Sequence, residues 1–103
     1  MQSEDPQLTS AFVKAYSAGI RGDRWPQTYS AFLSCLHFAA YDFENQTLAN
    51  GTVQLLRWNA DFNVSHRDLV ETYFPVFRTC AQEHAGGVMC AYDSIDGALA
   101  ECA

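Results

Sequence analysis

The sequence has little positive charge and no long hydrophobic run. Its single lysine is Lys14, and six basic residues stand against twelve acidic ones, for a formal net charge of −6. Nucleic acid and anionic membranes attract basic surfaces, so this balance argues against either as the main partner. The chain also lacks the run of about 18 apolar residues that a transmembrane helix requires. We therefore expect no nucleic-acid and no membrane partner.

We also expect that the first residues are not a signal peptide, because Met1 to Pro6 contain no basic stretch followed by an apolar one. The chain has 103 residues, of which 49% are hydrophobic and 14% aromatic. This is too apolar for an intrinsically disordered protein and provides one domain at most, with a modest core.

Cysteines and glycosylation sequons point to a secretory origin. The four cysteines form no C-x-x-C pair, and the histidines are not spaced for a zinc finger, so we expect no metal site and no cofactor. Three disulfide pairings are possible and the sequence does not choose among them, while four buried free thiols are the alternative. These cysteines are Cys35, Cys80, Cys90 and Cys102.

Three of the four asparagines begin sequons, namely Asn45, Asn50 and Asn63. Chance would give roughly half a sequon at this serine and threonine content. The excess indicates an extracellular glycoprotein, in which disulfides form. Because no signal peptide accompanies these features, we interpret the chain as a fragment of something longer.

The first half of the chain reads as a helix, a strand and a long loop. Asp5 and Pro6 are typical of a helix start, and Gly19 and Gly22 of its end. Between them one apolar face repeats every four residues, at Leu8, Phe12, Tyr16 and Ile20. The nearly continuous apolar run 31–40 predicts a buried strand, and the polar stretch 41–62 predicts a loop.

The second half reads as a helix and another strand. Ser65 and Asp68 are spaced as a capping box, and Pro75 should kink or locally open the helix that follows. Residues 88–92 predict a second buried strand, 94–97 a turn, and 98–103 the beginning of another helix. Two strands separated by a helix should be parallel and need neighbouring strands, which again indicates a fragment.

Four sequence blocks carry a family resemblance. They are EDPQLTS (4–10), CLHFAAYDFEN (35–45), SHRDL with YFPVF (65–69 and 73–77) and VMCAYDSIDG (88–97). In this order they resemble the β-xylosidase branch of glycoside hydrolase family three and cover nearly the whole chain. Any one block alone would be a weak signal.

The resemblance implies an α/β fold. Residues 1–103 would form one incomplete segment of an N-terminal (β/α)8 barrel domain, about two βα units. It implies retaining, exo-acting hydrolysis of terminal β-linked sugars, with a β-linked oligosaccharide or xyloside as ligand and the remainder of the barrel as partner. Such hydrolysis needs two carboxylates about 5–5.5 Å apart. In the family the nucleophilic aspartate lies on a later strand and the acid/base comes from later still, so we expect no catalytic residue here and an inactive isolated chain.

Three substrate-binding residues follow from the resemblance. His37 matches a sugar-binding histidine and Tyr92 a tyrosine beside the nucleophile, and both end a predicted strand. Arg57 matches an arginine that contacts sugar in the xylosidase branch. The alternatives are a core histidine, a core aromatic residue and a solvated arginine. Glu44 matches the branch's Glu-Asn pair and is first assigned to loop architecture.

Two residues depart from the family pattern. Leu36 replaces a lysine that hydrogen-bonds sugar, and Asp93 replaces an asparagine and adds a charge beside the place of the nucleophile. The loop between Glu44 and Arg57 is also about six residues longer than in relatives, as expected where insertions are tolerated. A non-catalytic sugar-binding or scaffold relative is therefore an alternative, and an independent small disulfide protein is another.

Overall fold

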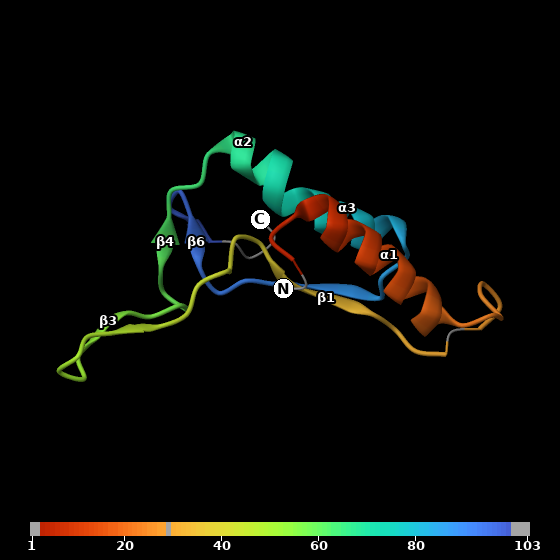
Figure 1. Cartoon of the computed structure of the whole chain (residues 1–103), viewed down its shortest axis with the longest axis horizontal. Helices are drawn as coiled ribbons and strands as arrows, with labels where there is room; N and C mark the ends of the chain where they lie inside the picture. Colours follow the sequence, from red (N-terminus) through yellow and green to blue (C-terminus); the bar gives the residue numbers. More distant parts are fainter. Residues whose placement is uncertain (1–2, 29, 100–103) are drawn as a thin grey trace.

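The computed structural model describes residues 3–28 and 30–99 (Figure 1). The helices are α1 (Pro6–Arg21), α2 (His66–Asp68) and α3 (Phe74–Gln82), with a π-helical turn, η1 (Leu69–Tyr73), between α2 and α3. The strands are β1 (Ser34–Phe38), β2 (Gln46–Thr47), β3 (Val53–Leu55), β4 (Asp61–Phe62), β5 (Gly87–Cys90), β6 (Ser94–Ile95) and β7 (Ala98–Leu99).

Strands β1 and β5 are parallel, as predicted, and the continuous helical stretch from α2 to α3 precedes β5. Cys35 pairs with Val88 and Leu36 with Met89, and the register shifts between Leu36 and Phe38. Strand β5 ends at Cys90, two residues before the predicted end. Parallel pairing brings the carboxyl ends of both strands to the same edge, where the predicted site residues lie.

Helix α1 begins and ends where its sequence signals indicate. One Asp5 carboxylate oxygen accepts hydrogen bonds from the backbone N–H groups of Gln7 (2.8 Å) and Leu8 (3.3 Å). Gly22 follows the last residue with φ of 79°, a left-handed conformation that glycine adopts without steric cost. The predictions for Asp5 and Gly22 are therefore confirmed, whereas Gly19, which was also predicted to end the helix, lies within it.

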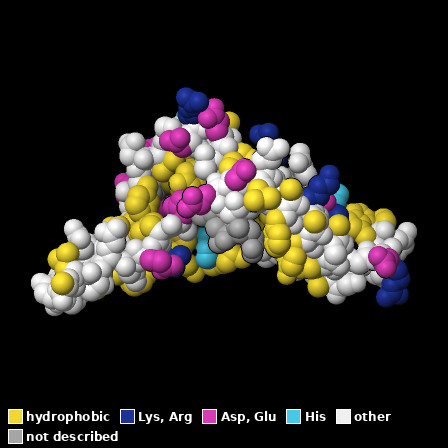
Figure 2. All heavy atoms as spheres, viewed as in Figure 1, with side chains coloured by type: hydrophobic (Ala, Val, Ile, Leu, Met, Phe, Trp, Pro, Cys, Tyr) yellow, Lys and Arg dark blue, Asp and Glu magenta, His cyan; other side chains and the backbone are white. Residues whose placement is uncertain are grey.

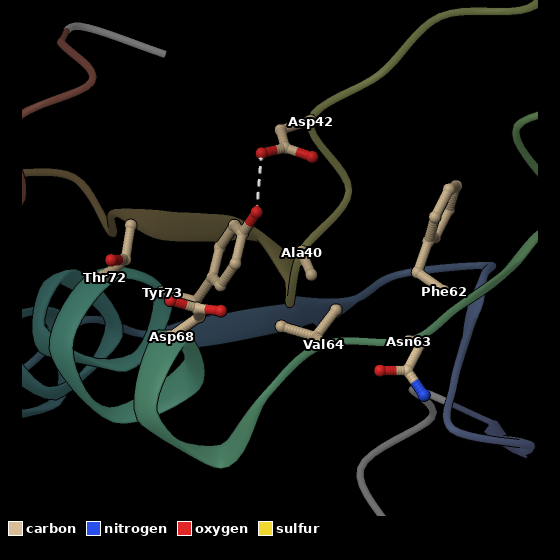
Figure 3. Close-up of a pocket in the computed structure, with 8 residues that line it drawn as sticks. All are labelled: Ala40, Asp42, Phe62, Asn63, Val64, Asp68, Thr72 and Tyr73. Carbon is tan, nitrogen blue, oxygen red and sulfur yellow. Dashed lines mark hydrogen bonds between the residues drawn. The ribbon is translucent and has the colours of Figure 1, made fainter.

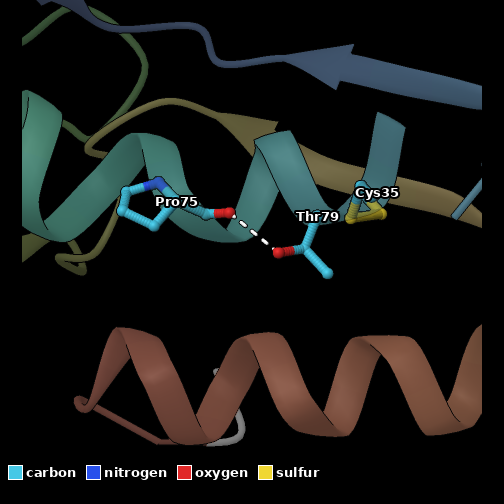
Figure 4. The surroundings of a disulfide bond; sticks show 4 residues. Cys35, Pro75 and Thr79 are labelled. Carbon is cyan, nitrogen blue, oxygen red and sulfur yellow. Dashed lines mark hydrogen bonds between the residues drawn. A yellow bond between two sulfur atoms is a disulfide. The ribbon is translucent and has the colours of Figure 1, made fainter. Parts of the chain in front are cut away.

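The packing of α1 differs from its apolar pattern. The helix contacts α3 and buries Thr9 and Ser17, while Leu8, Phe12 and Tyr16 remain 41–59% exposed. Figure 2 shows hydrophobic side chains gathered over this helix, and in Figure 4 α3 lies between the strands and α1. Small side chains at the contact allow the two helices to approach closely, so the large apolar residues face outward.

The far ends of α1 and α3 are joined by a half-buried ion pair. The Arg21 guanidinium donates to the backbone oxygen of Glu83 (2.7 Å) and to its carboxylate (3.0 Å). The same guanidinium lies 5.8 Å from the centroid of the Trp25 ring. The chain between α1 and β1 is thereby anchored to the end of α3.

The helical stretch 66–82 opens before its proline, as predicted. The Ser65 hydroxyl oxygen accepts from the backbone N–H of Asp68 (3.1 Å) and donates to the Asp68 carboxylate (2.7 Å). The π-helical turn η1 then ends just before Phe74 and Pro75. Proline lacks an N–H and crowds the preceding turn, which accounts for the wider turn. The Pro75 carbonyl accepts from the Thr79 hydroxyl (3.1 Å; Figure 4).

A disulfide between Cys35 and Cys80 joins β1 to α3, with the two Cα atoms 6.5 Å apart (Figure 4). This selects one pairing from the three that the sequence allows and confirms the expected disulfide. Cys90 is also disulfide-bonded. The expectation for Cys102 lies outside the described residues.

Several predictions of local structure are wrong. Strands β1 and β5 are not buried as predicted, and residues 94–95 of the predicted turn form strand β6. Residues 41–62 contain an antiparallel hairpin, β2–β3, and the short strand β4, which pairs in parallel with β6. The Asn50-Gly51 dipeptide is a strong hairpin signal, and Gly51 adopts φ of 83° there. Residues 98–99 form strand β7 and not the beginning of a helix, because Asp96 and Gly97 make a tight hairpin turn with β6. Residues 100–103 lie outside the description.

The chain buries little apolar material among its described residues. The buried hydrophobic residues are small: Ala39, Ala40, Ala60, Cys80 and Ala91. The Cα radius of gyration is 16.0 Å, against about 13 Å for a compact chain of this length. Figure 1 shows the β2–β3 hairpin projecting from the body. No described helix has the length and apolar character needed to cross a membrane.

Candidate functional site

The ends of the two parallel strands bring together two of the predicted site residues. His37 lies near the end of β1, and Tyr92 follows β5 by two residues. Their ring centroids are 6.3 Å apart with the planes tilted by 42°. Tyr92 is 56% exposed, so its ring is open to a ligand.

Tyr41 lies at the centre of this cluster, and the sequence reasoning did not single it out. Its ring centroid is 5.1 Å from that of His37 and 6.2 Å from that of Tyr92, both in edge-on geometry. Ala40, just before it, is buried and has φ of 59°. The left-handed conformation of Ala40 changes the direction of the chain after β1. An alanine adopts this conformation only at some steric cost. The sequence signal that could have identified Tyr41 is the Tyr-Asp pair within the 35–45 block, which is part of the family resemblance.

Arg57 joins the same cluster from the far side of the hairpin. Its Cζ atom lies 4.3 Å from the Tyr41 ring centroid, in cation–π geometry. Its Nη1 group donates to both carboxylate oxygens of Glu44, each at 3.0 Å. Its backbone N–H donates to Oδ1 of Asn45 at 2.8 Å. The alternative of a freely solvated arginine does not fit these contacts.

The two departures from the family pattern behave differently in the fold. Leu36, directly before His37, is 60% exposed. Asp93 is fully buried, and neither of its carboxylate oxygens has a hydrogen-bond partner in the described structure. Burial raises the pKa of Asp93 and the Asp42 carboxylate raises it further, while the backbone N–H of Asp93 itself and His37 act in the opposite direction. Burial therefore opposes the negative charge that the substitution was expected to add.

A cavity of about 330 Å³, lined by both polar and apolar side chains, includes Asp42 in its wall (Figure 3). The Tyr73 hydroxyl donates to an Asp42 carboxylate oxygen at 2.9 Å. Burial, this hydrogen bond and the Asp42 and Asp68 charges raise the pKa of Tyr73 to about 12. Each of these influences favours the neutral phenol, so Tyr73 keeps the proton that it donates to Asp42 up to a higher pH than a free tyrosine does. Asp42 is thereby fixed directly after the central tyrosine.

The three sequon asparagines are all exposed but have different surroundings. Asn45 accepts the hydrogen bond from Arg57, and Asn50 Oδ1 accepts from the Thr52 backbone N–H at 3.0 Å. Asn63 lines the cavity of Figure 3. Glycosylation at these positions stays a prediction. Within residues 3–28 and 30–99, no group of three or more histidine, cysteine, aspartate or glutamate side chains is arranged to hold a metal ion.

Comparisons with known proteins agree on one class. Probable beta-D-xylosidase 7 from Arabidopsis thaliana is 36% identical over 97% of this chain and 13% of its own length. Exo-1,4-beta-xylosidase bxlB from Emericella nidulans is 40% identical over 91% of this chain and 12% of its own. No protein-family model matches the chain.

Solved structures give the same result. A mutant beta-glucosidase from Listeria innocua in complex with laminaribiose superimposes with a TM-score of 0.67 and 31% identity, covering 93% of this chain and 12% of that one. The beta-glucosidase in complex with gluconolactone gives a TM-score of 0.69 at 28% identity, covering 95% of this chain and 13% of that one.

The chain has a mixed fold of helices and sheet strands, and both the fold and the comparisons make it a relative of the β-glycosidases. More narrowly, the chain belongs to glycoside hydrolase family three, of which it is a segment similar to the β-xylosidases. It spans only 12–13% of the length of the relatives described above.

Proposed function

We propose that this chain is the sugar-binding part of a secreted, retaining, exo-acting β-glycosidase that removes terminal β-1,4-linked xylosyl residues. The observation that carries the proposal is the cluster of His37, Tyr92 and Arg57 around Tyr41, at the carboxyl ends of two parallel strands. Barrel enzymes build their sites at these ends. The names of the curated relatives supply the xylose specificity.

The cluster offers the two kinds of contact that recognise a sugar. The exposed Tyr92 ring presents an apolar face to the C–H groups of a pyranose ring. The His37 imidazole and the Arg57 guanidinium supply hydrogen-bond donors for its hydroxyl groups. A site of this composition binds an uncharged, ring-shaped polyol and needs no metal or cofactor to do so.

The carboxylates around the cluster are all engaged or enclosed. Glu44 pairs with Arg57, Asp42 accepts from Tyr73, and Asp93 is buried. Retaining hydrolysis requires a nucleophile and an acid/base that both reach the sugar, about 5–5.5 Å apart. We therefore assign binding and no catalytic step to this segment, and place both catalytic carboxylates outside residues 1–103.

The need for the remainder of a barrel is supported by the packing. Leu36, Val88 and Met89 on the parallel strand pair are 39–60% exposed, although apolar residues of parallel strands are normally covered on both faces. The expected extracellular location rests on the three sequons and on the Cys35–Cys80 disulfide, which is stable in an oxidising compartment.

A non-catalytic relative that binds sugar is the second candidate. It is favoured by Leu36, whose exposed side chain offers no donor where the family pattern has a lysine. Both candidates have the same binding site. They differ in activity, because only the first predicts that a longer product of the same gene hydrolyses a xyloside. An independent small disulfide protein fits less well, because so little of the chain's large apolar surface is buried.

Binding is tested by titrating the 103-residue chain with xylobiose, with the α-linked disaccharide maltose as the control ligand, and following backbone and aromatic NMR signals. We expect shifts confined to the cluster, and an affinity about tenfold lower for His37→Ala, as for the loss of one good hydrogen bond. His66→Ala, on the exposed first residue of α2, is the matched control. A folded chain whose cluster signals ignore xylobiose would overturn the proposal.

A further inference from the structure

Arg57 is held by two consecutive residues on the opposite side of a hairpin. Glu44 accepts from its side chain with both carboxylate oxygens, and Asn45 accepts from its backbone N–H. Strand β2 begins directly after Asn45, and β3 ends two residues before Arg57. These contacts therefore close the base of the hairpin.

The guanidinium occupies this place in spite of a local cost. Its Nε–H group is buried and has no hydrogen-bond partner in the described part of the chain. An unpaired buried donor opposes burial. The contacts that hold the guanidinium there are the Glu44 carboxylate at 3.0 Å and the Tyr41 ring at 4.3 Å.

Glu44 is poorly placed to act as a stabilising residue. Its side chain is 81% exposed, whereas that of Arg57 is 27% exposed. Exposed ion pairs contribute little to the free energy of unfolding. Contact of one nitrogen with both oxygens nevertheless fixes where the guanidinium lies over Tyr41.

We propose that Glu44 and Asn45 are positioning residues that set Arg57 over Tyr41 for contact with the sugar. This inference rests on the proposed function. It also accounts for the tolerance of a long hairpin between residues 46 and 56. The two contacts fix Arg57 from the base of the hairpin, so the length of the tip does not change the place of the guanidinium.

The test uses NMR of the Arg57 side chain together with xylobiose affinity of the 103-residue chain. In the unmodified chain, hydrogen bonds to Glu44 should slow rotation of the guanidinium and give separate Nη resonances. Glu44→Gln should merge these resonances and lower affinity about three- to tenfold, the range for one weakened hydrogen bond. The thermal midpoint should stay unchanged. Glu71→Gln, which breaks the exposed Arg67–Glu71 pair elsewhere, should alter neither readout.

Asn45 needs a separate control, because it also begins a sequon. Thr47→Ala removes the sequon but keeps the Asn45 amide, so it should leave Arg57 and the affinity unchanged. Asn45→Ala should lower affinity as Glu44→Gln does, and Asn45→Asp should restore it because an acceptor oxygen remains.

The outcomes separate this inference from the proposed function. Absence of xylobiose binding by the unmodified chain would overturn the function, and the Nη resonances would still report whether Glu44 orders Arg57. Normal binding with unchanged Arg57 resonances and unchanged affinity in Glu44→Gln and Asn45→Ala would overturn the positioning role and leave the site intact.

Discussion

Cys35 and Cys80 join strand β1 to helix α3 two residues before His37, so the covalent anchor of the fold and the candidate site share one strand. The two cysteines are 45 residues apart in sequence. Cys80 is almost completely buried. The disulfide therefore constrains the whole segment that carries Tyr41, Arg57 and the hairpin.

The first prediction concerns this disulfide. Replacing both cysteines, as Cys35→Ala with Cys80→Ala, should lower the free energy of unfolding by about 4 kcal/mol, because a loop of this length loses that much closure entropy in the unfolded chain. Urea denaturation followed by circular dichroism measures the change. A decrease below about 0.5 kcal/mol would mean that the unfolded chain is not appreciably constrained by the bond.

The second prediction concerns Asp93 and its raised pKa. The folded state favours the neutral carboxyl of Asp93. Its contribution to the free energy of unfolding is therefore fully present below pH 3.8, the ordinary pKa of this group, and is lost as the pH rises from there through the raised pKa. Asp93→Asn should raise the free energy of unfolding at pH 7 by about 1.4 kcal/mol for each unit by which folding raises this pKa, because the amide has the same shape but carries no charge to bury.

The check on Asp93 is the pH dependence of denaturation for both proteins. Their difference should shrink toward zero as the pH falls below 3.8. Asp42 and His37 influence the same carboxyl, so Asp42→Asn should reduce part of the pH dependence without abolishing it. Equal stability of Asp93→Asn and the unmodified chain at every pH would show that the carboxyl is solvated.

The third prediction concerns Tyr73, whose pKa is raised from 10.0 to about 12. Spectrophotometric titration of tyrosinate should contain one group that ionises near this value, and Tyr73→Phe should remove it. Asp42→Asn should move that group back toward 10.0, because both the hydrogen-bond acceptor and its charge are changed. Stability from this tyrosine is present below pH 10.0 and is lost as the pH rises through about 12.

The fourth prediction concerns Leu36. Leu36→Lys places a donor next to His37, and we expect xylobiose affinity to rise about tenfold for each 1.4 kcal/mol of hydrogen bonding regained. Leu8→Lys is the matched control, since the Leu8 side chain is 59% exposed against 60% for Leu36 and lies on α1. A gain in both variants would indicate a general charge effect, and no gain in either would mean that leucine is not the damaging change.

Local signals in the sequence were sufficient for the start and end of α1 and for the start of α2. Asp5, Gly22 and Ser65 each act through hydrogen bonds or backbone angles within a few residues, so their roles can be read without the fold. Motif resemblance supplied His37, Tyr92 and Arg57, and strand ends predicted that the first two would meet. The Asn50-Gly51 hairpin signal was present but overlooked within a polar stretch.

Tertiary structure alone decided three further features. It selected Cys80 as the partner of Cys35, because pairing depends on distances between segments far apart in sequence. It placed Thr9 and Ser17 of α1 against α3, because close helix contact depends on fit and not on hydrophobicity alone. It made Tyr41 the centre of the site, since only the meeting of β1, β5 and the hairpin base brings His37, Tyr92 and Arg57 to one ring.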